Sequence, residues 1–180
     1  MKKIILSVIA VFAFGFANAQ GSDTMKFGVK AGFTSSNFTG DVTSDPSTGF
    51  YVGGLVDFPV SGNFHVQPEL LYSAEGGKDA KLNFLRIPIM AKYYIMQGLS
   101  LQAGPEIAFK AGGDEIKDYV KSMDYGLGIG AGYELSSGLM FDARYNLGLA
   151  DINDFPADGF GSENAKINTV SFNIGLGYRF

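Results

Sequence analysis

The last segment of the chain alternates strictly between apolar residues and small or polar ones. From Val170 to Phe180 every second residue is apolar, and the positions between hold serine, asparagine, glycine or arginine. Side chains of a β-strand point alternately to opposite faces, so this period of two predicts a strand whose faces meet unlike surroundings. Because the apolar face is uninterrupted and ends on an aromatic residue, we expect this face to contact apolar surroundings over the whole length of the strand.

The N-terminus has the three regions of a secretory signal peptide. Two lysines precede an apolar run over residues 4–16, and Ala17-Asn18-Ala19 forms an A-x-A cleavage site. We therefore predict a signal peptide over residues 1–19 and a mature domain over residues 20–180, which begins at Gln20. The alternative is a transmembrane anchor helix, but the run is short for the ~30 Å of hydrocarbon that such a helix must cross.

Composition narrows the function classes. The chain has no cysteine, so a lipid-anchored N-terminus, a disulfide and a cysteine-ligated metal are all excluded. Removal of the two lysines in the signal peptide changes the formal charge from −4 to −6, and nucleic acid is therefore not an expected partner. Beyond residue 19 no run of ~18 apolar residues occurs, so we expect no membrane-spanning helix. The mature length of 161 residues (180 minus 19) fits one domain.

Eight segments of the mature chain read as strands, and turn-forming residues separate them. Tight turns rich in serine and glycine alternate with longer polar connections, which is the layout of outer-membrane barrels whose tight turns face the periplasm. An even number of strands then places both termini in the periplasm. The predicted strands are residues 26–35, 48–59, 63–73, 81–96, 99–110, 122–135, 139–149 and 168–180; the tight turns are 60–62, 97–98 and 136–138; the longer connections are 36–47, 111–121 and 150–167, with a shorter loop at 75–78 on the same side as these.

The two faces of these strands distinguish two kinds of eight-stranded barrel. In residues 139–149 the apolar face opposes Asp142, Arg144 and Asn146, and in residues 122–135 it opposes four glycines. A soluble lipocalin-like barrel would have the reverse arrangement, an apolar lumen and a polar exterior. We therefore predict an all-β fold, an eight-stranded antiparallel up-and-down transmembrane β-barrel of the cell outer membrane with lipid as its outer solvent. A soluble β-sandwich would need neither the signal peptide nor the all-apolar last strand.

The inward face of the predicted barrel carries five basic and five acidic residues. Eight strands enclose a space just wide enough for side chains. Buried charges are costly unless they are paired, so we expect a packed ion-pair network in the lumen. An ion or proton path through the lumen is the alternative. The predicted network is Lys30, Asp57, Glu69, Arg86, Lys92, Glu106, Glu134, Asp142, Arg144 and Arg179.

Three prolines fall inside predicted strands, at Pro68, Pro88 and Pro105. Proline cannot donate to a β-ladder, and a closed barrel has no edge strand to accommodate it. We therefore expect these prolines at β-bulges. A bulge would shift the register by one residue, which would exchange the faces of Glu69 or Arg86.

Two segments are distinctive, residues 67–73 (QPELLYS) and 85–94 (LRIPIMAKYY), and residues 101–105, 144–149 and 27–32 fit the same pattern. Together they resemble the PorT-like outer-membrane β-barrel family, which has the small-barrel architecture of OmpA and OmpX. The resemblance covers essentially the mature chain, and it implies that the family carries these prolines routinely. The family's name-giving member belongs to a secretion and gliding apparatus, and fold alone does not transfer that role.

The chemistry expected for an enzyme is sparse. His65 is the only histidine, and it follows a turn expected in the periplasm, away from the outer face where small barrel enzymes meet their substrates. The acidic outer loops lack the spacing and the closing glutamate of an EF-hand loop, and the Gly-x-Gly pairs lie in strands. We expect no catalytic residue, no cofactor and no metal. The functional classes left open are a structural or interaction protein, a narrow channel and a barrel enzyme.

We expect the partners to be outer-membrane lipid, the barrel assembly machinery and a protein bound at the extracellular loops. Residues 150–167 form the longest connection, in which Phe155 and Phe160 are candidate contacts among acidic and glycine residues. The alternative is that these rings dip into the headgroup layer. The expected assembly signal is the apolar stripe of the last strand, Phe172, Ile174, Leu176, Tyr178 and Phe180.

Overall fold

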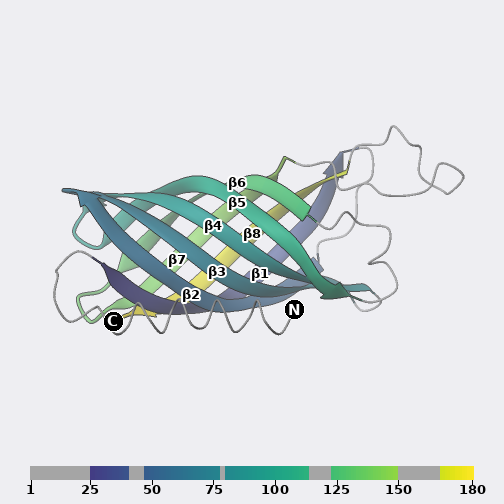
Figure 1. The fold of residues 1–180 in the computed structure, drawn as a ribbon, viewed down its shortest axis with the longest axis horizontal. Coiled ribbons are helices and arrows are strands. Elements are labelled where there is room, and N and C mark those ends of the chain that lie inside the picture. The colour runs from purple at the N-terminus through teal and green to yellow at the C-terminus, as the bar shows by residue number, and fades with distance from the viewer. Residues whose placement is uncertain (1–24, 41–46, 78–79, 114–122, 150–166) are drawn as a thin grey trace, which may run out of the picture.

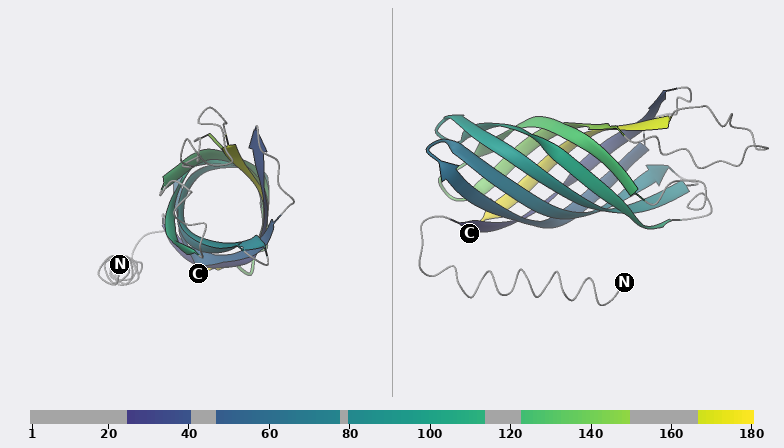
Figure 2. Two further views of the ribbon diagram at one scale, coloured as in Figure 1. Left: turned by 90° about the vertical axis from the view of Figure 1, so that its right-hand side faces the viewer. Right: turned by 45° about the horizontal axis from the view of Figure 1, so that its top comes forward.

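The structure is a closed antiparallel barrel in which each strand pairs with its neighbours in the sequence and β1 pairs with β8 (Figures 1 and 2). It is a computed structural model that describes residues 25–40, 47–77, 80–113, 123–149 and 167–180. The prediction of eight strands and of the fold class is confirmed. The strands are β1 (Lys26–Gly40), β2 (Ser47–Ser61), β3 (Phe64–Gly77), β4 (Ala80–Met96), β5 (Leu99–Gly113), β6 (Met123–Glu134), β7 (Leu139–Gly148) and β8 (Ile167–Arg179).

The strands are staggered by ten residues around the barrel. A row of paired residues that starts at Phe58 on β2 passes through all the other strands and returns to β2 at Thr48, which is ten residues away (58 to 48). This stagger tilts the strands relative to the barrel axis, as Figure 1 shows. The closed ladder leaves no edge strand along the described wall.

The two ends of the barrel differ. At one end, here called the turn end, lie the three tight turns, the start of β1 and the C-terminus (left in Figure 1). Each turn contains a glycine with positive φ, at Gly62 (49°), Gly98 (83°) and Gly138 (88°), a conformation that costs glycine no steric strain. At the other end, here called the loop end, lie the strand ends that border residues 41–46, 78–79, 114–122 and 150–166.

Several strands extend further towards the loop end than the sequence pattern predicted. β1 continues from Ser35 to Gly40, and β3 continues from Ser73 to Gly77. Glu75 was expected in a connection and instead lies in β3, where its side chain is buried. The period of two carries through this stretch, because Glu69, Leu71, Ser73 and Glu75 all face the lumen.

The expectation of bulges at the three prolines is wrong. Each proline instead leaves two consecutive residue pairs out of the ladder with the preceding strand, and the register is the same on both sides of each gap. Pro88 points into the lumen and is fully buried, whereas Pro105 points outward. Because the register does not change, Glu69 and Arg86 keep their inward orientation. The register shifts lie elsewhere, at Pro59/Ser61, Asn83/Phe84 and Tyr94/Met96.

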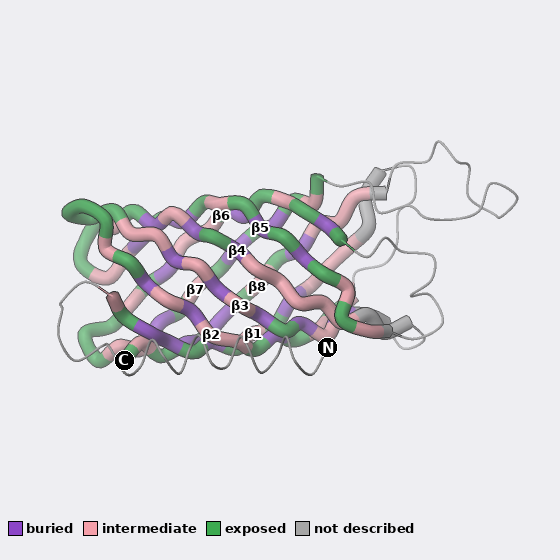
Figure 3. The backbone as a smooth tube through the Cα atoms, in the orientation of Figure 1, coloured by how far each residue is buried: buried purple, intermediate pink, exposed green. Residues whose placement is uncertain are grey.

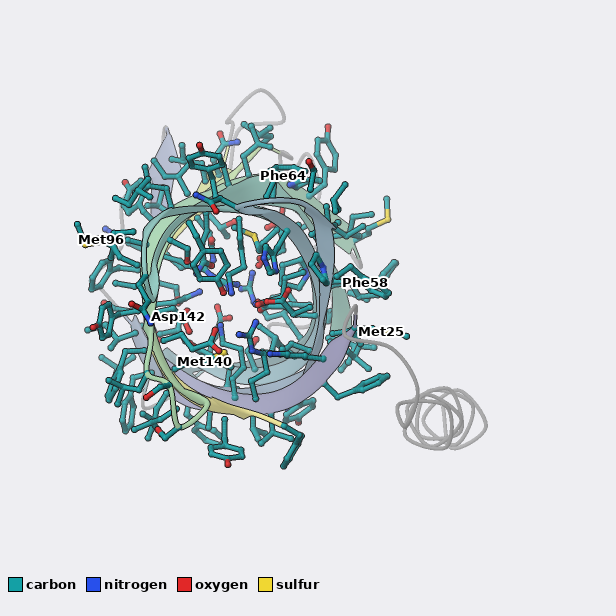
Figure 4. All side chains as sticks on the ribbon, turned by 90° about the vertical axis from the view of Figure 1, so that its left-hand side faces the viewer. Met25, Phe58, Phe64, Met96, Met140 and Asp142 are labelled. Atoms are coloured by element: carbon teal, nitrogen blue, oxygen red, sulfur yellow. The ribbon has the colours of Figure 1, made fainter. Side chains whose placement is uncertain are left out.

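The barrel has an apolar exterior and a polar interior. Exposed and buried residues alternate along the strands in Figure 3, and Figure 4 shows side chains both inside and outside the ring, with Phe58, Phe64 and Met96 outside and Met140 inside. Large apolar side chains are exposed all round the wall, for example Ile129 (55%) and Ile174 (57%). Within the described residues no helix is long and apolar enough to cross a membrane. The barrel is therefore inside-out relative to a soluble protein.

Candidate functional site in the lumen

The structure brings all ten predicted lumen residues into ion pairs. These pairs form three clusters along the axis: a turn-end cluster, a central cluster and a loop-end cluster. The central and turn-end clusters join strands far apart in the sequence, since inward side chains of eight strands share one narrow space, whereas the loop-end cluster joins the consecutive strands β3, β4 and β5. His65 and Glu75, which were not among the ten, belong to the network as well.

The central cluster is built around Glu69 on β3, whose side chain is fully buried. Arg144 on β7 donates from its two terminal nitrogens to the two carboxylate oxygens, at 2.8 and 2.5 Å. The Nζ atom of Lys30 on β1 lies 3.6 Å from Glu69 and 2.9 Å from Asp142. Arg144 also donates from Nε to Gln102 at 3.0 Å. Two cations and two carboxylates thus neutralise each other across the full width of the lumen.

The turn-end cluster is built around Asp57 on β2. Its carboxylate lies 2.5 Å from Nδ1 of His65, 3.5 Å from Nζ of Lys92 and 2.7 Å from a terminal nitrogen of Arg179. Arg179 also pairs with Glu134, which accepts a hydrogen bond from the hydroxyl of Tyr94 at 3.1 Å. Lys92 donates to Gln67 at 2.9 Å, and Gln67 donates to Glu69, so this cluster is continuous with the central one.

The loop-end cluster is built around Arg86 on β4. The guanidinium donates to Glu106 at 2.6 Å and to Glu75 at 2.9 and 2.5 Å. Ser73 accepts from Arg86 at 3.1 Å and donates to Glu75 at 2.9 Å. Glu75 could have been found from the sequence, because it has the same parity as Glu69 in one strand. The glycine pair that follows it was taken as a loop signal instead.

Glycine and apolar side chains fill the rest of the lumen. A Cβ atom at Gly130 would lie 2.9 Å from Cγ of Arg144, and one at Gly175 would lie 2.7 Å from a carboxylate oxygen of Asp142. These glycines therefore leave space for the charged side chains that cross from other strands. Buried apolar side chains that the sequence did not single out as lumen residues also point inward: Leu55, Leu71, Met90 and Met140.

Two small cavities lie beside the clusters, and each has room for about 20 Å³, enough for one water molecule. One lies between the central and turn-end clusters and is lined by Lys30, Gln67 and Lys92. The other lies at the loop end and is lined by Glu75, Arg86, Glu106 and Asp124. Ionic side chains therefore occupy most of the described lumen.

The single histidine of the chain belongs to the turn-end cluster. The ring of His65 contacts Asp57 and packs edge-on against Tyr94 at 4.8 Å. It lies at the turn end, where the sequence placed it. In the described ranges no group of three or more histidine, aspartate or glutamate side chains is arranged to hold a metal ion.

The five residues of the expected assembly signal form an outward stripe on β8 and the C-terminal residue, and each is about half exposed. Tyr178 and Phe180 pack edge-on with ring centroids 5.5 Å apart. The N–H of Phe180 donates to the carbonyl of Phe27 on β1 at 2.8 Å. The candidate interaction residues Phe155 and Phe160, and the predicted signal peptide, lie outside the described residues.

Comparisons with known proteins agree with this geometry. A family model described as "Outer membrane protein beta-barrel domain" matches residues 18–154. No curated protein sequence matches the chain significantly.

Solved structures that resemble the chain are small barrels. Ail, the attachment invasion locus protein of Yersinia pestis, is 14% identical with a TM-score of 0.53, over 88% of this chain and all of Ail. Neisserial surface protein A is 14% identical with a TM-score of 0.59, over 86% of this chain and 97% of the other. The outer membrane enzyme PagL is 14% identical with a TM-score of 0.61, over 84% and 98%. At this identity the similarity shows the fold alone.

Proposed function

Because this chain belongs to the outer membrane protein beta-barrel domain family, we propose that it is a non-catalytic barrel of the outer membrane that closes its own lumen and acts through its loop end. The observation that carries this proposal is the central cluster. Glu69 on β3 is held by Lys30 on β1 and Arg144 on β7, so three strands from different sides of the barrel are joined across the lumen. A rigid plug of this kind supports a structural or interaction role rather than conduction.

The contacts of His65 support a non-catalytic role. A histidine that serves as a general base needs a nucleophile within about 2.6–3.2 Å, and its other nitrogen is then oriented by an acid. Asp57 supplies the acid, but it is shared with Lys92 and Arg179 in a structural cluster. The resemblance to PagL concerns the fold, which hosts both enzymes and non-enzymes.

The difference between the two ends of the barrel supports the proposed orientation. Three tight turns and the C-terminus lie at the turn end, and outer-membrane barrels keep short turns in the periplasm and longer loops outside. We place the turn end in the periplasm and the loop end at the cell surface, with residues 1–19 removed as a signal peptide. The stripe on β8 is then available to the barrel assembly machinery during insertion.

The partner contact is assigned to the loop between β7 and β8, through Phe155 and Phe160. A barrel whose wall is covered by lipid and whose turns are minimal meets other proteins through its loops. The test replaces both phenylalanines with serine and measures chemical crosslinking in intact cells. We expect normal folding by the heat-dependent shift in electrophoretic mobility and fewer crosslinks to a surface protein. Unchanged crosslinks with normal folding would exclude this loop as the interaction site.

A second candidate is a component of a secretion or gliding apparatus, like the name-giving member of the PorT-like family. Its support is the resemblance of residues 67–73 and 85–94 to that family; the two segments contribute Glu69, Arg86 and Lys92 to the ion-pair network. This role predicts that deletion of the gene abolishes protein secretion or gliding while general membrane integrity is kept. Normal secretion and gliding in the deletion strain would exclude it.

The narrow channel is the third candidate, and planar bilayers distinguish it from the plugged barrel. The wild-type protein should show no steady conductance, because the three clusters block the lumen. If Arg144→Ala folds without loss of stability and opens a steady conductance, the ion-pair network gates a channel, and the channel function replaces that of a plugged barrel.

A further inference from the structure

The loop-end half of the lumen contains polar atoms without partners. Five buried side-chain oxygens in the described part of the chain have no hydrogen-bond partner, and all five lie level with Arg144 or closer to the loop end. Buried polar atoms are normally satisfied, so an unsatisfied group calls for a bound polar partner. The five are the side-chain oxygens of Thr34, Ser47 and Tyr51, Oδ1 of Asp124 and Oδ1 of Asn173.

Asp124 stands out because it is charged. It is the second residue of β6 and is only 9% exposed. Its Oδ2 accepts a hydrogen bond from the hydroxyl of Thr169 at 2.7 Å, and its Oδ1 has no hydrogen-bond partner among the described residues. A carboxylate so far removed from water is costly unless a positive charge compensates it.

The nearest cation of the loop-end cluster is already engaged. Arg86 donates through Nε, NH1 and NH2 to Glu75, Glu106 and Ser73, and no ion pair joins it to Asp124 in the described structure. Lys110 lies at the rim of β5 and has an interaction of its own. The loop-end cavity therefore has three carboxylates on its wall and one arginine that is bound to two of them.

The cavity beside Asp124 has the size and lining for a small cation. It admits about 20 Å³, and its lining residues include Asp124, Asn146, Thr169 and Ser171 together with Arg86 and its partners Glu75 and Glu106. The described residues lack the three convergent ligands that a metal ion would need. The head group of a primary ammonium has three N–H donors and is about the size of a water molecule, and it suits a free carboxylate oxygen in a cavity whose three carboxylates outnumber its one arginine.

We propose that Asp124 is the anionic centre of a binding site for a primary ammonium group, which enters the lumen from the loop end. The ammonium donates one hydrogen bond to the free Oδ1 and the others to neutral oxygens that line the same cavity. Its source is a small free amine or the side chain of a lysine, which present the same head group.

The test uses the purified, refolded full-length barrel in detergent and measures its thermal unfolding. Methylammonium chloride should raise the unfolding midpoint of the wild type saturably, by about 3 °C or more. Tetramethylammonium chloride, which has the same charge but no N–H group, should have no such effect at equal ionic strength. An equal response to both salts overturns the proposal.

Asp124→Asn gives the decisive comparison. Without amine it should unfold at a higher temperature than the wild type, because a buried charge with no ion-pair partner among the described residues has been removed, and it should not respond to methylammonium. The matched control is Asp142→Asn, in which the lost carboxylate is paired with Lys30. It should unfold at a lower temperature and keep its response to methylammonium. A lowered midpoint in amine-free Asp124→Asn, or a retained response, overturns the proposal.

An NMR titration of the wild-type protein tests the proposal without relying on variants that could fail to fold. Methylammonium should shift the backbone amide resonances of Asp124 and Thr169 saturably in NMR spectra, and an absence of shifts overturns the proposal. Nα-acetyl-lysinamide then distinguishes the two sources. Binding at least tenfold tighter than methylammonium indicates a lysine side chain, whereas equal or weaker binding indicates a free amine.

Discussion

At the scale of single residues, the lumen depends on charge pairs that join distant strands. Glu69 and Arg144 are 75 positions apart in the chain and form a two-point contact with no exposure of the carboxylate. Lys30 and Asp142 complete the central cluster. Removal of one member leaves the others buried without full compensation, which costs more than the pair itself contributes.

Arg144→Ala tests this dependence. We expect a loss of about 3–5 kcal/mol in the free energy of unfolding, because Glu69 keeps only Lys30 as a cationic partner. Urea unfolding in lipid vesicles measures the loss. Lys26→Ala, at an exposed position of β1, is the control and should change stability by less than about 0.5 kcal/mol. A similarly small effect of Arg144→Ala would contradict the plug.

At the scale of the element, each strand separates lipid from a polar core, and depth along the strand sets the tolerance to charge. Ile129 lies midway along β6, and it pairs with Ala103 and Tyr145 on the neighbouring strands. Leu147 lies one residue from the loop end of β7. Both side chains point outward and are exposed.

Arginine substitutions at these two positions should differ in effect. Ile129→Arg should destabilise the barrel by about 2–4 kcal/mol, because the charge lies near the middle of the bilayer. Leu147→Arg should cost less, because its side chain reaches the headgroup region more easily. Unfolding in vesicles measures both. Equal costs, or no cost for Ile129→Arg, would show that the apolar band is not centred on these residues.

The last strand should be sensitive to loss of its final residue. Deletion of Phe180 removes the aromatic end of the outward stripe and the backbone bond from its N–H to Phe27, which helps to close the seam between β8 and β1. We expect reduced levels in the outer membrane, as measured by fractionation and immunoblotting. Phe180→Tyr keeps the aromatic ring and the backbone bond and should assemble normally. Normal levels of the truncated protein would refute an assembly role for this residue.

At the scale of the whole molecule, closure of the ladder makes the barrel cooperative. Every strand has two neighbours and the stagger is ten residues, so no strand can leave without breaking two ladders. The three proline gaps weaken single steps in the ladder but leave the register unchanged.

The intact molecule should therefore resist SDS until it is heated, and folded and unfolded forms should migrate differently in electrophoresis. N-terminal sequencing of the same material from the outer membrane should begin at Gln20. Equal migration before and after heating would argue against a closed barrel. Detection of Met1 in the membrane-inserted protein would disprove cleavage.

The fold was accessible to prediction because its signal is local. A period of two reports the two faces of a strand from consecutive residues, and tight turns carry their own glycines, so eight strands and their faces could be read without knowledge of pairing. The inward set of ten charged residues followed from the same parity. The end of β3 at Gly77 was not predicted, because two consecutive glycines are typical of a loop. The sequence does not reveal that β4 continues to pair with this stretch.

The ion-pair partners of these charged residues could not be predicted from the sequence, because they depend on how far each strand is shifted relative to the others around the barrel. A shift of one strand by two residues keeps every face and changes every neighbour across the lumen. Only the closed barrel places Arg144 on Glu69, brings His65 and Glu75 into the network and leaves Oδ1 of Asp124 without a donor. Local patterns set which side chains face inward, and the geometry of closure sets which of them meet.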